Sequence, residues 1–380
     1  RDSRADSSQA RLILASCFFS VISKAGSFSK GNLPETMVAG DWPTALAPMQ
    51  DVTSLPFMQV VARRGSPDFF FTEFIRVHAH SRIDPEILSS ILDKPDERPV
   101  FAQLIGENLS DLRRVARELK SLPIAGVDLN LGCPAPRVYR KNVGGGLLRD
   151  PEKIRQILDV LGEESSSLLT VKMRIGFEDD RFFETILEII AESSVGLVSI
   201  HARTVRGGYQ SEPSYRHVAK AVGILPCPVL LNGSVETAGH ALHLREETGV
   251  HGIMIGRSAI RNPWVFRQIR ELQAGREIFR PKLGDLYDYV EDLYRSLGKP
   301  GIPETRLVAR MKKFLNFVGL SVDSQGGFLH AMRRSKTRSE LFGICEDYMK
   351  KTGREEEDFS LEPFAHLARP KIKACSEGLS

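Results

Sequence analysis

Short apolar segments that recur between longer amphipathic stretches constrain the fold of this chain more than any other feature. From residue 43 onward each segment holds at most seven residues and is rich in Val, Ile, Leu and Phe, as parallel strands buried on both faces are. The segments lie at residues 44–48, 68–74, 99–105, 126–132, 168–174, 197–203, 228–233 and 252–257.

Apolar residues at helical spacing fill most of the intervals, most clearly at 108–120, 151–161, 181–192 and 236–246. Eight successive strand–helix units predict an α/β fold in which the strands close into a (β/α)8 TIM barrel. A doubly wound open sheet is the alternative, and the regular spacing favours closure. Near residues 275–284 the alternation stops, and the pattern that follows predicts a small all-helical domain.

We therefore expect a barrel over residues 41–280, a helical domain over 285–350 and a loose tail over 351–380. Residues 1–40 are rich in serine and predict a disordered leader or the remnant of a transit peptide. The apolar run in that segment is too short to span a bilayer, so we expect no membrane association. The predicted location is the cytoplasm, or a chloroplast or mitochondrion if the leader is a transit peptide, and not the exterior.

Composition narrows the class of protein further. The 380 residues are 42% hydrophobic and 26% charged, which excludes a wholly disordered chain and a polytopic membrane protein. The five cysteines are scattered and form no CxxC pair, so we expect neither a disulfide framework nor a metal site. A reducing compartment and a monomer are the expected setting.

Basic residues gather in one window although the net charge of the whole chain is only +4. Residues 299–338 hold nine basic and two acidic residues, which is typical of a surface that binds a polyanion. From charge alone, a solvated helix surface is the more common explanation. The residues expected to contact such a partner are Arg306, Arg310, Lys313, Arg333 and Arg334.

Polar side chains share one face of three consecutive predicted strands, because residues two apart in a strand point the same way. Buried charge must be paired or used, so we expect this face to form a site at the carboxyl ends of the barrel strands. The face carries Asp128, Asn130, Lys172, Arg174, His201 and Arg203.

Two glycine-containing turns end the last two predicted strands, at Asn232-Gly233-Ser234 and at Gly256-Arg257. Glycine lets the backbone approach a ligand, and each turn opens a helix whose free N–H groups attract anions. We expect a phosphorylated cofactor or substrate here, with a purely structural pair of turns as the alternative.

Four side chains suggest redox chemistry. Lys172 and His201 suit an electron-rich ring such as a flavin, and Gln103 could add an amide contact. Cys133 follows a predicted strand and precedes Pro134, at the expected catalytic rim. A free thiol there can act as a general acid or a nucleophile.

Taken together, the motifs resemble the tRNA-dihydrouridine synthase family over residues 43–345. They are APMQDVT at 47–53, NLGCP at 130–134, VKMRIG at 171–176, HART at 201–204, NG at 232–233 and GIMIGR at 252–257. The resemblance implies an FMN-containing barrel that reduces uridine in tRNA to 5,6-dihydrouridine with electrons from NADPH or NADH. It further implies that the flavin N5 hydride goes to C6 and that Cys133 protonates C5.

The resemblance also implies a role for each matching position. Pro48, Met49 and Gln50 would lie against the flavin, and Gln103, Lys172 and His201 would contact its ring system. Asn130, Arg174 and Arg203 would border the base, and the helical domain would grip tRNA. The ribityl phosphate would be held by Asn232, Gly233, Ser234, Gly256 and Arg257.

Two positions depart from the family pattern: Ser234 stands where an acid is common, and the loop at 203–209 is spelled differently. Two other functions remain open at this stage. An FMN barrel reductase for a small molecule would explain the cofactor turns but not the basic helical domain. A tRNA-binding protein without catalysis would have no use for Cys133, Lys172 and His201.

Overall fold

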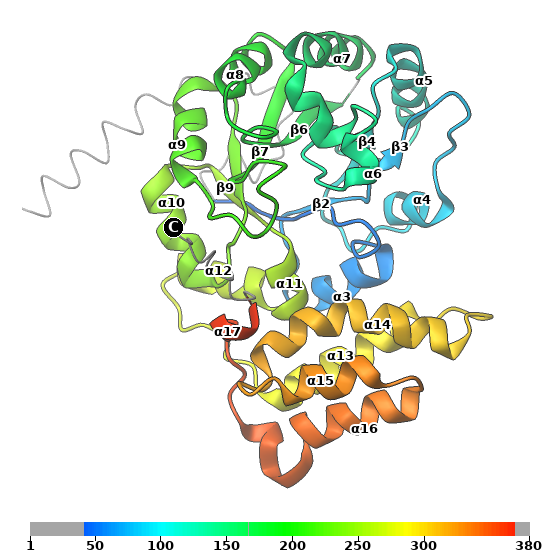
Figure 1. Cartoon of the computed structure of the whole chain (residues 1–380), viewed down its shortest axis with the longest axis vertical. Coiled ribbons are helices and arrows are strands. Elements are labelled where there is room, and N and C mark those ends of the chain that lie inside the picture. The colour runs from blue at the N-terminus through cyan, green and yellow to red at the C-terminus, as the bar shows by residue number, and fades with distance from the viewer. Residues whose placement is uncertain (1–41, 166, 369–380) are drawn as a thin grey trace, which may run out of the picture.

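The computed structural model describes residues 42–165 and 167–368, which form a barrel and a helical domain that lies against one side of it (Figure 1). The predicted leader at 1–40 lies outside the described residues. Among the described helices, none is long and apolar enough to cross a membrane.

Eight parallel strands of the described residues form a closed ring, in which β1 pairs with both β2 and β9 and β2 pairs with β4. The predicted (β/α)8 barrel is therefore confirmed, and a short additional strand, β3, pairs with β4 beside the ring. The strands are β1 (Thr44–Leu46), β2 (Phe69–Phe71), β3 (Ile75–Arg76), β4 (Val100–Ile105), β5 (Gly126–Leu131), β6 (Leu168–Arg174), β7 (Val195–His201), β8 (Val229–Asn232) and β9 (Gly252–Ile255).

Helices surround the ring (Figure 1), and most of them contribute buried apolar side chains to one core cluster with the strands. In α5, for example, Asn108 caps the first turn by accepting the Asp111 N–H, and Leu112 and Val115 are buried. The barrel helices are α3 (Leu55–Gly65), α4 (Pro85–Leu92), α5 (Leu109–Leu119), α6 (Pro136–Tyr139), η1 (Gly144–Arg149), α7 (Pro151–Glu164), α8 (Phe183–Ala191), α9 (Tyr215–Ile224), α10 (Ala238–Thr248), α11 (Arg257–Arg261) and α12 (Val265–Gln273).

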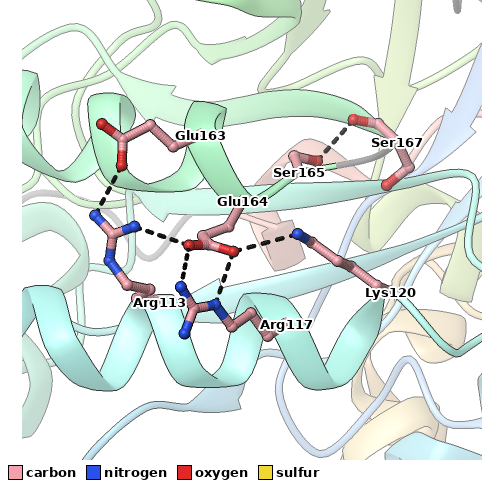
Figure 2. A network of polar contacts seen from close by, with 7 residues as sticks. All are labelled: Arg113, Arg117, Lys120, Glu163, Glu164, Ser165 and Ser167. Carbon is pink, nitrogen blue, oxygen red and sulfur yellow. Dashed lines mark hydrogen bonds and ion pairs between the residues drawn. The ribbon is translucent and has the colours of Figure 1, made fainter.

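An ion-pair network joins α5 to the end of α7 on the outside of the barrel (Figure 2). Glu164 accepts hydrogen bonds from Arg113, Arg117 and Lys120. The Arg117 guanidinium is the main cause that lowers the pKa of Glu164 to about 2. The network fixes two neighbouring barrel helices to each other and lies away from the carboxyl ends of the strands.

Inside the ring, an apolar layer lies towards the amino ends of the strands, and a polar layer lies above it, towards their carboxyl ends. Phe71 stacks on Phe101 with ring centroids 4.8 Å apart, and Phe69 meets Phe101 edge-on. β1 ends at Leu46, two residues earlier than predicted, so Pro48, Met49 and Gln50 lie in the loop between β1 and α3. The apolar layer closes the interior from below, which leaves the polar layer to form the floor of a site.

The helical domain packs on α3 and α11 through both apolar and charged contacts. Phe314 lies 5.3 Å from Phe57 between ring centroids, and Asp292 pairs with Arg64. Tyr289 is buried and donates its hydroxyl to the Ile260 carbonyl. The domain comprises α13 (Leu283–Leu297), α14 (Glu304–Val318), η2 (Gly319–Ser321), α15 (Gly327–Arg334) and α16 (Arg338–Met349).

The described part of the predicted loose tail is anchored at a few points, although most of its residues are exposed. It contains η3 (Lys351–Glu356) and α17 (Ala365–Ala368), and Phe359 between them is buried. The Leu283 N–H donates to the Glu357 carbonyl, and Arg261 of the barrel donates to the Leu361 carbonyl. An apolar anchor and backbone hydrogen bonds therefore hold this segment against both domains, and its remainder, 369–380, lies outside the described residues.

Candidate functional site

A cavity of about 870 Å³ opens at the carboxyl ends of the barrel strands. Its walls come from the loops and strand ends of the barrel, with Phe317 and Leu320 of the helical domain at one edge. Every residue predicted to contact the cofactor or the base, except Gln103, lines this cavity. They are Pro48, Met49, Gln50, Asn130, Cys133, Lys172, Arg174, His201, Arg203, Asn232, Gly233, Ser234, Gly256 and Arg257.

Strand register places the polar side chains at one level of the barrel. Arg174 is paired with His201 across β6 and β7, and His201 is paired with Asn232 across β7 and β8. Lys172 donates to the Asn232 side-chain oxygen at 3.2 Å, and the Asn232 amide nitrogen donates to the Met254 carbonyl at 2.8 Å. These hydrogen bonds fix the orientation of the Lys172 and Asn232 side chains on the cavity wall.

The cavity is strongly cationic. Six of its lining residues are Lys or Arg, whereas Glu236 is the single carboxylate among them. Burial, followed by repulsion from Arg174, lowers the pKa of Lys172 to about 8. Burial, again with the Arg174 charge, lowers the pKa of His201 well below 6.5, so this ring is neutral at pH 7. Such a site favours an anionic ligand, which would relieve the repulsion among the cations.

The two predicted turns follow the adjacent strands β8 and β9, and both line the cavity. Gly233 has a φ of 111°, and a Cβ there would lie 3.2 Å from the His201 ring. Arg203 donates to the Ser234 hydroxyl at 2.7 Å, and the Tyr209 ring lies 4.0 Å from the Arg257 guanidinium carbon. These residues leave room and positive charge for a phosphate beside the backbone.

The His201 ring also offers an unused polar atom. Its Nδ1 is buried and has no hydrogen-bond partner among the described residues. Buried polar atoms are rarely left unpaired, so this nitrogen fits a hydrogen bond to a ligand in the cavity. Lys172 lines the same cavity, so the wall offers a neutral hydrogen-bonding atom near a cationic one.

Cys133 lies half-buried in the cavity wall, on a tight turn after β5. The Gly132 and Cys133 N–H groups both donate to the Asn130 side-chain oxygen, at 3.0 and 2.9 Å. Gly144 has a φ of 58°, and a Cβ there would come within 3.0 Å of the Cys133 Cβ. The glycine run after Cys133 thus packs closely against the turn and helps to fix the thiol at the rim.

Gln103 is not among the residues that line the cavity, and its contact with the cofactor ring stays a prediction. Its side chain is fully buried below the floor, where its nitrogen donates to Asp128 at 2.7 Å. Its oxygen accepts from the Asn130 amide at 2.8 Å. Both ends of the Gln103 amide are therefore engaged by protein groups.

Three of the five predicted polyanion contacts follow one face of α14 towards the cavity. Arg310 donates to the Ser54 hydroxyl at 3.2 Å, and Lys313 lies 3.5 Å from the Asp51 carboxylate. Arg306 is exposed one turn earlier on the same face, and Phe317 one turn later lines the cavity. We call Arg306, Arg310 and Lys313 the α14 stripe.

The other two predicted contacts, Arg333 and Arg334, lie on α15 and do not line the cavity. Arg333 donates to the Asn316 side chain, and Arg334 donates to the His330 carbonyl. The structure therefore separates the predicted basic residues into a stripe that leads to the cavity and a pair that does not.

Sequence reasoning missed several residues around the site. Tyr209 is half exposed and covers Arg257, and Glu73 lies beside Asp51 at the junction of the two domains. The alternation in β5 placed Asp128 on the inward face but gave it no role. In the described residues, no group of three or more His, Cys, Asp or Glu is arranged to hold a metal ion.

Comparison with known proteins shows the family to which the chain belongs. The profile of the "Dihydrouridine synthase (Dus)" family matches residues 45–315. A Helicobacter pylori protein named "Probable tRNA-dihydrouridine synthase" is 33% identical over 228 residues, which cover 59% of this chain and 69% of the relative. A Bacillus subtilis protein named "Probable tRNA-dihydrouridine synthase 2" is 27% identical over 315 residues, covering 80% and 94%.

Among solved structures, an old yellow enzyme homologue from Zymomonas mobilis matches with a TM-score of 0.43 and 12% identity, covering 63% of this chain and 89% of the other. The family profile alone spans well over half of the chain. This chain belongs to the dihydrouridine synthase family.

Proposed function

We propose that this protein is an FMN-dependent tRNA-dihydrouridine synthase. The reaction converts uridine, NADPH or NADH and one proton into 5,6-dihydrouridine and the oxidised nicotinamide. One observation carries the proposal: a single cavity brings together the Cys133 thiol, a cationic wall and two glycine turns, and the α14 stripe leads to its edge. A reductase of free small molecules would need no such stripe.

The cavity residues fit FMN by charge and by shape. Gly233, Ser234 and Arg257 would hold the phosphate, and Lys172 with the unpaired His201 nitrogen would contact the ring system. When bound, FMN supplies the hydride that it receives from the nicotinamide. The Lys172 charge would stabilise the negative charge that a reduced flavin carries.

Cys133 would hold the proton that uracil C5 receives. Its thiol lies on the turn after β5, beside the cationic side chains of β6, so a base bound there has a proton donor next to it. Arg174 and Arg203 would border the base and stabilise charge that develops on its carbonyl oxygens. Reduction of the C5=C6 bond needs both a hydride and a proton, and this arrangement provides for each.

The base must leave its stack to enter a cavity of this kind. Binding of the adjacent phosphates by the α14 stripe can offset the free-energy cost of unstacking the base. Phe317 at the cavity edge offers an apolar surface beside them. Because the stripe and the cavity adjoin, one tRNA molecule could contact both.

The proposal is tested with purified protein and three substrates. We expect a yellow protein whose flavin is bleached by NADPH and is reoxidised faster by tRNA that lacks dihydrouridine than by fully modified tRNA. A small enone should not accelerate reoxidation. Reoxidation by the enone and not by tRNA would instead identify a small-molecule reductase, and a colourless protein that still binds tRNA would identify a binding protein.

A further inference from the structure

A buried carboxylate lies below the wall that carries Cys133. Asp128 of β5 is fully buried and does not line the cavity. One of its oxygens accepts from the Gln103 amide nitrogen at 2.7 Å, and the other accepts from the Thr170 hydroxyl at 2.6 Å. The carboxylate is therefore held on both sides, and Gln103 provides its hydrogen-bonded connection towards the cavity.

Further hydrogen bonds connect Gln103 to the Cys133 turn, and in each of them the group nearer to Cys133 is the donor. The Gln103 oxygen accepts from the Asn130 amide nitrogen, and the Asn130 oxygen accepts from the Gly132 and Cys133 N–H groups. We call Asp128, Gln103 and Asn130 the amide series. It runs from the floor of the barrel to the backbone that bears the thiol.

The direction of the amide series is fixed at both ends. A backbone N–H can only donate, and an ionised carboxylate can only accept. Burial raises the pKa of Asp128 to about 6, which leaves it ionised at pH 7.5 or above. If the Gln103 amide turned over, its oxygen would face the Asp128 carboxylate and its nitrogen would face the Asn130 nitrogen, leaving buried polar groups unpaired.

We propose that Asp128 is a positioning residue, which orients the Gln103 and Asn130 amides so that Asn130 holds the Cys133 turn in place. This inference rests on the proposed function, in which Cys133 delivers a proton. Asp128 does not line the cavity and reaches the Cys133 turn through the two amides, while its charge also favours the charged form of Lys172. The Gln103 and Asn130 amides could each be rotated to exchange oxygen and nitrogen. The Asp128 carboxylate can only accept hydrogen bonds, so it fixes the orientation of both.

The consequence for catalysis is geometric. Proton transfer needs the thiol within hydrogen-bond reach of the receiving atom. A displacement of about 1 Å can cost a factor on the order of 100 in rate. Loss of the Asn130 acceptor would free two N–H groups of the turn and allow such a displacement, while the cationic wall on β6 and β7 would stay intact.

The test compares Asp128→Ala with Thr170→Val, which removes the other hydrogen bond to the same carboxylate. For Asp128→Ala we expect the dihydrouridine rate at saturating tRNA to fall by roughly 10- to 100-fold, with the KM for tRNA and the FMN content nearly unchanged. Thr170→Val should stay within about threefold of wild type. Equal losses in the two variants, or a normal rate in Asp128→Ala, would overturn the proposal.

A second readout does not depend on tRNA reduction. Iodoacetamide labelling of Cys133, followed by peptide mass spectrometry, reports the local freedom of the turn. Labelling should be at least about threefold faster in Asp128→Ala than in Thr170→Val or wild type. If wild type makes no dihydrouridine, the proposed function fails, while the labelling difference still decides the role of Asp128; equal labelling rates refute that role.

An exchange of the acid and the amide keeps the proposal testable if Asp128→Ala does not fold. Asn130→Asp alone places a carboxylate at each end of Gln103, which can donate to only one of them. Adding Asp128→Asn restores a donor for the Gln103 oxygen and reverses the series. We expect the melting temperature to fall in Asn130→Asp and to recover by more than half in the pair; no recovery would contradict the fixed direction.

Discussion

Glu73 at the junction of the two domains should make the stability of this protein fall as the pH rises towards neutrality. Its carboxylate accepts the Asp51 N–H at 2.9 Å and lies near the Arg310 charge. Burial is the largest influence and raises the pKa of Glu73 from 4.5 to about 7, outweighing that N–H and Arg310. The charged form is therefore the one that the fold disfavours.

The size of the effect follows from the difference between the two pKa values. An acid with a raised pKa contributes stability that is fully present below about 4.5 and is lost as the pH rises through about 7. The complete loss corresponds to roughly 3 kcal/mol, of which about 2 kcal/mol falls between approximately pH 5.5 and pH 8. Glu73→Gln keeps the shape and an acceptor for the Asp51 N–H but removes this titration.

Urea unfolding at both pH values provides the assay. Relative to wild type, Glu73→Gln should gain about 2 kcal/mol when the pH is raised over that interval. Glu86→Gln is the matched control, because the Lys299 hydrogen bond lowers the pKa of Glu86 and no such gain should appear. Parallel pH curves for wild type and Glu73→Gln would refute the reasoning.

Three other predictions concern separate parts of the molecule. Replacing Arg306 and Lys313 by Ala should weaken tRNA binding and reduce its log–log salt slope by roughly 2, measured by filter binding, with Arg295→Ala as the control; an unchanged slope counts against the α14 stripe. Arg257→Ala should weaken FMN binding by roughly 10-fold or more in a fluorescence titration, whereas Arg206→Ala at the cavity rim should not, and equal affinities would remove Arg257 from the phosphate site. Glu164→Gln should lower stability at neutral pH, and its gap to wild type should shrink as the pH falls from about 4.5 towards 2, because the pKa of Glu164 is lowered; Glu163→Gln should show less of both effects.

The barrel and the inward side of its strands were predictable because both depend on short-range patterns. Alternation in a strand fixes which side chains share a face, so the sequence alone predicts that Lys172 and His201 belong to one site. Closure of the ring then brings together strands that are distant in sequence. For this reason the predicted cofactor and base residues, apart from Gln103, line a single cavity.

What the sequence could not specify depends on depth and on contacts between elements. Gln103 has the same inward parity as its neighbours, but it lies one layer lower, where Asp128 and Asn130 occupy both ends of its amide. Likewise, composition grouped Arg333 with Arg310, although α15 carries the first and α14 carries the second beside the barrel. Hydrogen-bond partners and helix packing are set by the tertiary fold, and neither leaves a local signal in the sequence.

The central claim, that this protein reduces uridine in tRNA with Cys133 as the acid, is tested most directly by nucleoside mass spectrometry. Purified wild type, Cys133→Ala and Cys227→Ala are incubated with NADPH and tRNA from cells that lack dihydrouridine. We predict dihydrouridine with wild type and Cys227→Ala, and a loss of about 100-fold in Cys133→Ala although its flavin is still bleached by NADPH. No product with wild type, or full product with Cys133→Ala, would contradict the account.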